Sequence, residues 1–280
     1  MLTVFIPKVR NMKGYNSYRI SAPTEFKDIF SHFYYAENRS GETVEKTLLP
    51  SYQTIMIFSF GTPTSFISKN KEEIKVEKCI VLGPIKHAFD YILPEDAEIL
   101  VCNFKDDAFF RFFGNAALND DLAMHPDELL NENCFTTLWS ELKKIDSNEN
   151  RVQAMLDFCQ PYLRDRDSVA EQIADFDRTS FSPIKEISKR NKISERSLQT
   201  NHKKHFGYTS KEIYRYQRFL KAIQIIQNNS CKNIKIDWFD VINQCGYYDQ
   251  SQLIKDFRHY IHLSPSKYLK FQEPICDPKN

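Results

Sequence analysis

The sequence lacks most of the patterns that identify an enzyme, a membrane protein or a secreted protein. Its 280 residues include only seven glycines and seven cysteines, and the cysteines never form a Cys-x-x-Cys pair. No apolar run approaches the roughly 18 residues of a membrane helix. The start, MLTVFIPKVR, has neither a basic leader nor a small-residue cleavage site. These absences predict a bacterial-type cytoplasmic protein in a reducing compartment, with no membrane segment.

Motifs for catalysis and cofactor binding are missing as well. The histidines of the first half (His32, His87 and His125) are far apart, and no His-x-His occurs, which argues against a metal-dependent cupin enzyme. The chain has no serine nucleophile turn and no phosphate-binding glycine loop. We therefore expect no enzyme activity, no catalytic residue, no metal ligand and no cofactor.

Charge is distributed unevenly along the chain. Residues 1–167 have 19 Lys and Arg against 25 Asp and Glu, whereas residues 168–272 have 18 against 10 and four of the seven histidines. A basic region gains free energy near a polyanion by releasing condensed counterions. The alternative to binding a polyanion is that this basic region is merely a solvated surface of mixed charge. Together with the length, this asymmetry predicts two domains.

The first region, residues 1–165, has the pattern of a β domain. Short segments rich in β-branched and aromatic residues alternate with turns up to about Phe104. They are SFISKN, KCIVLGP, HAFDYIL and EILVCNF. The pattern predicts an antiparallel, cupin-like barrel or sandwich. The segments DDAFFRFFGN, CFTTLWSELKKI and VQAMLDFCQPYLRD follow and predict helices, the first ending at Gly114.

A small β barrel can hold an apolar or sugar-like ligand. Its candidate lining residues are aromatic: Tyr52, Phe58, Phe60, Phe89, Tyr91 and Phe104. The alternative is that they are ordinary core residues.

The second region, residues 166–272, predicts an all-α domain that contains two similar units. In residues 182–207 and again in residues 236–270, a helix, a short turn and a second helix follow one another, and Ser182 is the expected cap of the first helix. A linker helix is predicted over residues 209–228. A helix from about residue 210 to residue 227 is about 27 Å long at 1.5 Å per residue, close to the roughly 34 Å of one DNA turn. One chain could therefore present both second helices to a duplex.

The most informative stretch is GYYDQSQLIKDFRHYIHLSPSKYL, residues 246–269. Asp249 and Gln252 form a capping-box pattern that begins a helix. One face of this helix is apolar and the others are polar or cationic. A second helix start follows at Ser264 and Pro265.

These residues resemble the AraC/XylS family of bacterial transcription regulators, whose DNA-binding domain is a pair of helix-turn-helix units. The resemblance covers about the last 100 residues. The matching positions are Gly246, Tyr247, Asp249, Gln250, Ser251, Phe257, Arg258, Ser264, Pro265 and Tyr268, with Arg218 and Ala222 in the linker helix. Where the family has a Leu-x-Arg-x-Phe run, this sequence has Leu198, Thr200 and His202, so the last two depart from the pattern. Ser210, Ile242 and His262 are further departures.

By position, the resemblance implies a set of base-facing residues in each second helix. They are Glu195, Arg196, Gln199, Thr200 and Lys203 in the first unit, and Gln250, Ser251, Gln252, Ile254 and Lys255 in the second. Their chemistry suits the task, because Gln can bridge adenine, Arg and Lys favour guanine, and Ile can touch a thymine methyl. A merely solvated side chain is the alternative for each. His202 has the spacing of a core residue.

Other cations are better placed for phosphates, which orient a protein on DNA without specifying sequence. They are Lys204, Arg215, Lys232, Lys235, Arg258 and Lys267.

The resemblance implies a sequence-specific transcription regulator whose first half senses a small-molecule effector, dimerises, or does both. A weaker resemblance to the β-rich sensor domains of such regulators covers about 75 residues of that half. The expected partners are double-stranded DNA, a small-molecule effector, a second copy of the chain and, for an activator, RNA polymerase. The alternative function is a ligand-binding or catalytic β-barrel protein with a basic helical interaction module.

Overall fold

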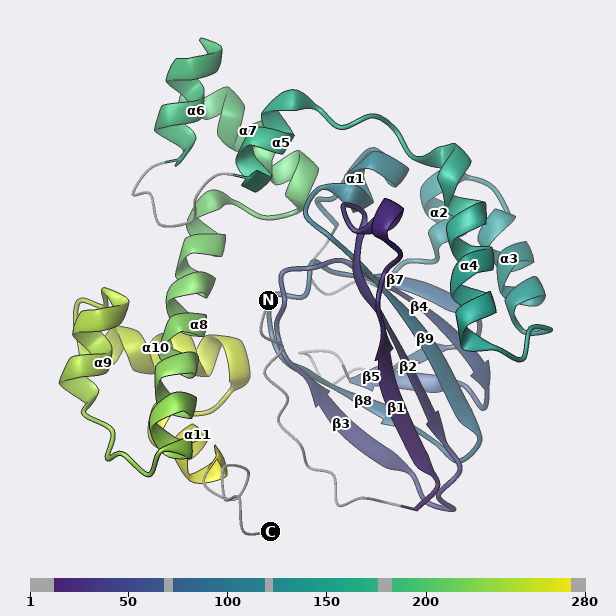
Figure 1. Cartoon of the computed structure of the whole chain (residues 1–280), viewed down its shortest axis with the longest axis horizontal. Helices are drawn as coiled ribbons and strands as arrows, with labels where there is room; N and C mark the ends of the chain where they lie inside the picture. Colours follow the sequence, from purple (N-terminus) through teal and green to yellow (C-terminus); the bar gives the residue numbers. More distant parts are fainter. Residues whose placement is uncertain (1–12, 68–72, 119–122, 176–182, 273–280) are drawn as a thin grey trace. The chain divides into compact units, whose positions relative to one another are not determined.

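The computed structural model describes residues 13–67, 73–118, 123–175 and 183–272. The chain forms two compact units, residues 1–209 and residues 210–280 (Figure 1). The boundary predicted near residue 165 lies inside the first unit, because the first helix-turn-helix packs with the β domain. The functional division into 1–165 and 166–272 therefore stays a prediction. The initial MLTVFIPKVR segment and Ser182 lie outside the described residues.

Two antiparallel sheets make up the β domain, which confirms the predicted barrel or sandwich. The first sheet has the order β1-β2-β9-β4-β7 and the second the order β3-β8-β5-β6. The strands are β1 Tyr15–Ile20, β2 Phe30–Asn38, β3 Val44–Leu48, β4 Ile55–Gly61, β5 Thr64–Ile67, β6 Glu73–Val76, β7 Cys79–Leu82, β8 Phe89–Leu93 and β9 Ala97–Phe104. The last strand ends at the predicted Phe104.

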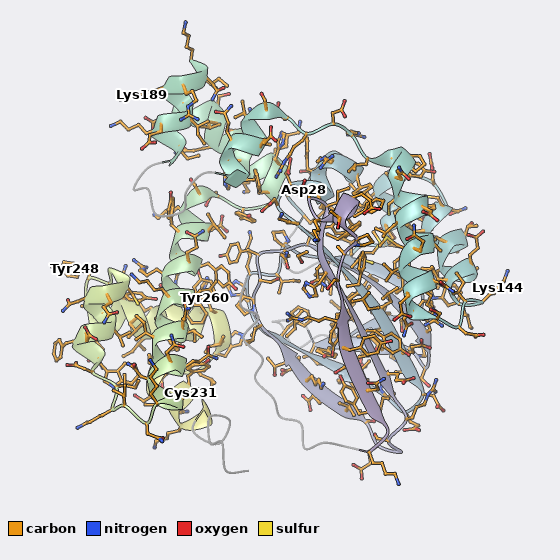
Figure 2. The ribbon with its side chains drawn as sticks, in the orientation of Figure 1. Asp28, Lys144, Lys189, Cys231, Tyr248 and Tyr260 are labelled. Carbon is orange, nitrogen blue, oxygen red and sulfur yellow. The ribbon has the colours of Figure 1, made fainter. Side chains whose placement is uncertain are left out.

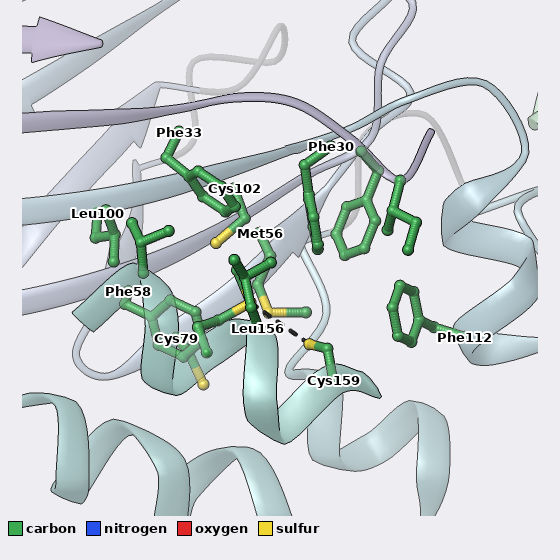
Figure 3. Close-up of a cluster of buried hydrophobic side chains, with 14 of the residues drawn as sticks. Phe30, Phe33, Met56, Phe58, Cys79, Leu100, Cys102, Phe112, Leu156 and Cys159 are labelled. Atoms are coloured by element: carbon green, nitrogen blue, oxygen red, sulfur yellow. Dashed lines mark hydrogen bonds between the residues drawn. The ribbon is translucent and has the colours of Figure 1, made fainter. Parts of the chain in front are cut away.

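The first sheet separates two hydrophobic cores. Side chains alternate between the faces of a strand, so Ile55 and Ile57 of β4 face the second sheet, whereas Met56 and Phe58 face a layer of helices. Figure 3 shows the helix-side core, where Phe58 lies with Leu100 and other buried side chains. Both faces of this sheet are buried, which explains why β4 and β9 are almost continuously apolar.

Four helices cover the outer face of the first sheet (Figure 1). They are α1 Ala108–Phe113, α2 Pro126–Leu130, α3 Cys134–Leu142 and α4 Asn148–Cys159. As predicted, α1 ends at Gly114, which has a left-handed conformation. The buried Arg151 of α4 forms an ion pair with Glu98 of β9 and donates a hydrogen bond of 2.7 Å to the Ile145 carbonyl. These contacts hold α4 on the sheet.

The remaining α-helices form the two helix-turn-helix units and the linker helix that joins them. The first contains α5 Ser168–Asp175, α6 Pro183–Asn191 and α7 Glu195–Phe206, and its small core is built on Ile184, Ile187 and Leu198. The second compact unit contains α8 Ser210–Cys231, α9 Trp238–Cys245, α10 Gln250–Ile261 and α11 Pro265–Gln272. The linker helix α8 has 22 residues, so it is about 33 Å long, longer than predicted. In the described ranges, no helix has the length and apolar character needed to cross a membrane.

The turn between α6 and α7 contains a strained backbone position. Lys192 is exposed and has a φ of 54°, a conformation that costs a residue with a Cβ about 1 kcal/mol relative to glycine. Lys192→Gly should therefore raise the midpoint of thermal unfolding by a few degrees. In the matched control, Lys189→Gly within α6, the same change should lower the midpoint, because glycine weakens a helix by about 1 kcal/mol. Shifts of the same sign in both variants, measured by differential scanning calorimetry, would contradict this account.

Candidate nucleic-acid interface

The N-terminus of α10 is built by two reciprocal side-chain caps. The Asp249 carboxylate accepts a hydrogen bond of 2.8 Å from the backbone N–H of Gln252, and the Gln252 side-chain oxygen accepts one of 2.9 Å from the backbone N–H of Tyr248. The predicted helix start at Asp249 is confirmed, but the Gln252 oxygen reaches the N–H of Tyr248, one residue before the cap, rather than that of Asp249 as in a standard capping box. Because its oxygen serves the cap, Gln252 has only its amide N–H groups left to offer a base. Bidentate recognition of adenine needs both the side-chain oxygen and an amide N–H of a glutamine.

The two faces of α10 differ sharply. Leu253, Asp256, Phe257, Tyr260 and Ile261 are buried. At about 100° per residue, Gln250, Ser251, Ile254, Lys255 and Arg258 share one edge, and all are exposed except the half-buried Ile254. The half-buried Gln252 lies at the margin of this edge. The structure thus brings together five of the six candidates on this helix.

A buried ion-pair cluster fixes α10 on the linker helix. The side chain of Asp256 is only 1% exposed, and its two oxygens lie 2.6 Å from Arg215 Nε and 3.1 Å from Arg218 Nη2. Arg218 also lies over the ring of Tyr247, and Arg215 over that of Tyr260. Arg215, a predicted phosphate contact, is therefore engaged inside the domain. Figure 2 labels Tyr260 beside α8.

The sequence prediction missed Asp256. A signal was present, because this acidic residue occupies the apolar helix face between Leu253 and Phe257. Tyr248 was missed as well. It directly precedes the cap of α10 and is 92% exposed, so it widens the polar edge of the helix with an aromatic ring (Figure 2).

The second helix of the first unit, α7, also has a polar face. Ser194 caps its N-terminus by accepting a hydrogen bond of 3.1 Å from the backbone N–H of Ser197. All six candidates on this helix are exposed: Glu195, Arg196, Gln199, Thr200, Lys203 and Lys204. His202 is buried, and its Nδ1 donates a hydrogen bond of 2.7 Å to the Tyr208 carbonyl, which confirms its predicted core position.

The C-terminal end of α7 packs against the β domain and α1. The backbone N–H of Ala116 donates a hydrogen bond of 3.0 Å to the Lys204 carbonyl. The rings of Phe110 and His205 stack with centroids 3.8 Å apart, and the Lys204 ammonium lies 5.5 Å from the centre of the Phe110 ring. Lys204 therefore belongs partly to this contact, whereas Lys203 is free of it.

The structure distributes the six aromatic ligand candidates over three places. Phe58, Phe60 and Phe104 lie in the core between the first sheet and the helices. Phe89 and Tyr91 belong to the core between the two sheets. Tyr52 packs edge-on against Tyr208. They do not line one common space.

One group of side chains has the composition of a cysteine-protease site. Cys79 Sγ lies 3.3 Å from His125 Nε2, and Asp127 lies 3.5 Å from the other ring nitrogen. Burial raises the pKa of the Cys79 thiol to about 12, which disfavours the thiolate form at neutral pH. Asp127 instead accepts hydrogen bonds from the start of α3, at Phe135 and Thr136. The group is structural.

Two capped helix-turn-helix units with exposed polar edges define a DNA-binding domain. The chain matches the model of a helix-turn-helix domain family over residues 187–270, and this region is an AraC-type helix-turn-helix domain. No curated protein sequence matches the chain.

Several solved structures are similar to the chain. A structure of ToxT from Vibrio cholerae is 15% identical, with a TM-score of 0.41, and the match covers 92% of this chain and 97% of ToxT. ToxT bound to (E)-4-(8-methylnaphthalen-1-yl)but-3-enoic acid is also 15% identical, with a TM-score of 0.40 and coverage of 92% and 98%. A cupin protein from Desulfovibrio desulfuricans is 12% identical, with a TM-score of 0.25 and coverage of 35% and 90%.

Removal of the Asp256 carboxylate should destabilise the second compact unit. Asp256→Ala leaves two guanidinium groups without their anion, and because both guanidinium groups are partly exposed to solvent we expect a loss of about 1–3 kcal/mol. In the control, Asp240→Ala on the exposed side of α9, the loss should be below about 0.5 kcal/mol. Urea unfolding followed by fluorescence measures both. Equal stability of the two variants would show that the cluster contributes little.

The docking of α7 can be tested with two glycines that each end a helix in a left-handed conformation, Gly207 after α7 and Gly246 after α9. Gly207 and Gly246 have φ values of 77° and 72°, so alanine is strained at either position by about 1 kcal/mol. A Cβ at Gly207 would lie 2.3 Å from the Ala116 carbonyl oxygen, whereas a Cβ at Gly246 meets nothing within 4 Å. Gly207→Ala should therefore cost about 1–3 kcal/mol more than Gly246→Ala in thermal unfolding. Equal losses would mean that the contact with Ala116 is absent in solution.

Proposed function

We propose that this chain is a sequence-specific DNA-binding transcription regulator. Helices α7 and α10 each enter a major groove, and the β domain senses a small molecule or mediates dimerisation. The AraC-type domain supports DNA binding as the class of activity. Two successive grooves on one face of the duplex are the expected target, because α8 is about as long as one DNA turn.

The exposed edge of α10 is the observation that carries the proposal. Gln250, Ser251 and Lys255 point away from a face that is fully buried in the domain. An amide, a hydroxyl and an ammonium on one edge supply both donors and acceptors for base edges. Since the Asp256 cluster and the Asp249 cap hold the helix in place, this edge is rigid before DNA arrives. Preorganisation of this kind lowers the cost of binding.

In this proposal the phosphates are contacted by exposed cations outside the base-facing residues of α10. They are Lys232, Lys235, Arg258 and Lys267, with Lys204 at the margin of α7. Arg215 is left out of this set because its Nε pairs with Asp256.

DNA binding over a salt series tests the proposal. Fragments of the chain's own promoter region and of neighbouring genes are compared with random DNA of equal length. At about 150 mM salt, a specific complex should be at least about 10³ times tighter than a nonspecific one. If the chain bound none of these fragments more tightly than random DNA, only the alternative of a basic interaction module would remain.

The division of roles among α10 side chains makes a sharper prediction. Gln250→Ala and Lys255→Ala should each cost about 1–3 kcal/mol on the specific site and little on random DNA, because each removes a contact to a base. Lys267→Ala should weaken both DNAs alike and reduce the slope of log K against log salt by about 1, because it removes a phosphate contact. Parallel losses in all three variants, measured by fluorescence anisotropy, would refute this assignment.

A further inference from the structure

Tyr248 presents an aromatic ring to solvent directly before helix α10. The residue is 92% exposed, on the surface of the second compact unit (Figure 2). A single exposed aromatic residue is ordinary on a protein surface, so exposure alone assigns it no role. The place of Tyr248 in the fold is more informative, because the residues on both sides of it are fixed.

The backbone around Tyr248 is anchored at three points. Its own N–H donates a hydrogen bond of 2.9 Å to the side-chain oxygen of Gln252. On one side Tyr247 is buried, and the Arg218 Cζ atom lies 4.4 Å from the centre of the Tyr247 ring. On the other side Asp249 caps α10. The backbone of Tyr248 is therefore held in place, and rotation of the side chain alone directs the ring.

The ring lies next to the exposed edge of α10. Tyr248 stands two residues before Gln250 and three before Ser251, and both of these are exposed. In helix-turn-helix complexes the N-terminal residues of the second helix are the ones that contact base edges. If α10 lies in a major groove, the Tyr248 ring therefore meets the same duplex as Gln250 and Ser251.

A phenol side chain can make two kinds of contact with DNA. Thymine presents its C5 methyl group in the major groove, and aromatic rings make apolar contact with that methyl. The hydroxyl at the tip of the ring is also able to donate to a phosphate oxygen, which carries no sequence information. The exposed Gln250, Ser251 and Lys255 all end in polar groups, so an apolar surface is what Tyr248 adds to this edge.

We propose that Tyr248 is a specificity-determining residue that packs its ring against the C5 methyl group of a thymine beside the bases read by α10. The inference rests on the proposed DNA-binding function, and it names a residue and a base that this function does not require by itself. Burial of one methyl group changes an affinity about fourfold. The contact is therefore large enough to select one base over the others.

Selection of bound DNA from a randomised duplex pool tests this preference with the full chain. The native chain and Tyr248→Phe should both enrich thymine at one position beside the site, whereas Tyr248→Ala should lose the preference at that position alone. The control is Phe239→Ala, which removes a ring that is 79% exposed on α9. Phe239 is followed by the exposed Asp240, whose carboxylate repels phosphates, so this variant should keep the thymine.

Replacement of the selected thymine by deoxyuridine measures the contact directly, because it removes only the methyl group. In fluorescence anisotropy, this replacement should raise the Kd of the native chain and of Tyr248→Phe about fourfold. It should leave the Kd of Tyr248→Ala unchanged. Since Tyr248 is exposed, the thermal unfolding of both variants should match that of the native chain.

A selected sequence without such a thymine, or a thymine preference that survives in Tyr248→Ala, would overturn the inference and leave the proposed function intact. Equal losses in Tyr248→Phe and Tyr248→Ala would overturn it as well, because they would assign the contact to the hydroxyl. If the native chain enriched no sequence from the pool, the proposed function would fail and the inference with it.

Discussion

Asp256 is a buried carboxylate held between two guanidinium groups. The orientation of the exposed edge of α10 depends on this cluster. Arg215 and Arg218 lie on consecutive turns of α8, so together they bind Asp256 of α10 in one orientation. The aromatic rings of Tyr247 and Tyr260 cover the guanidinium groups. A purely apolar contact between α8 and α10 could slide or rotate at little cost, whereas ion pairs with fixed hydrogen-bond directions resist both motions.

In the first unit, helix α7 is also held in place while its polar face stays exposed, but its partner is the β domain. Helix α7 is held at its N-terminus by Ser194 and at its C-terminus by a contact with Ala116 and Phe110. The position of α7 therefore depends on the β domain as well as on its own small core of Ile184, Ile187 and Leu198.

The sequence predicted local features well and long-range ones poorly. The helix start at Asp249, the helix stop at Gly114 and the last strand up to Phe104 all follow from residues within a few positions of each other. The pairing of Arg215 was not predicted, because its partner Asp256 is 41 residues away in the chain. The six aromatic ligand candidates were chosen by residue type, and the structure separates them because β4 and β9 have two buried faces.

By itself, the sequence determined the element types, the β and α regions and the AraC-type character of residues 187–270, because these depend on periodicity, caps and motif spacing. Tertiary structure alone decided which charges are available. It paired Arg215 with the buried Asp256 and engaged the side-chain oxygen of Gln252 at the start of α10. The physical reason is that the environment of a charged group is set by side chains distant in the chain, and local sequence patterns do not specify which of them meet.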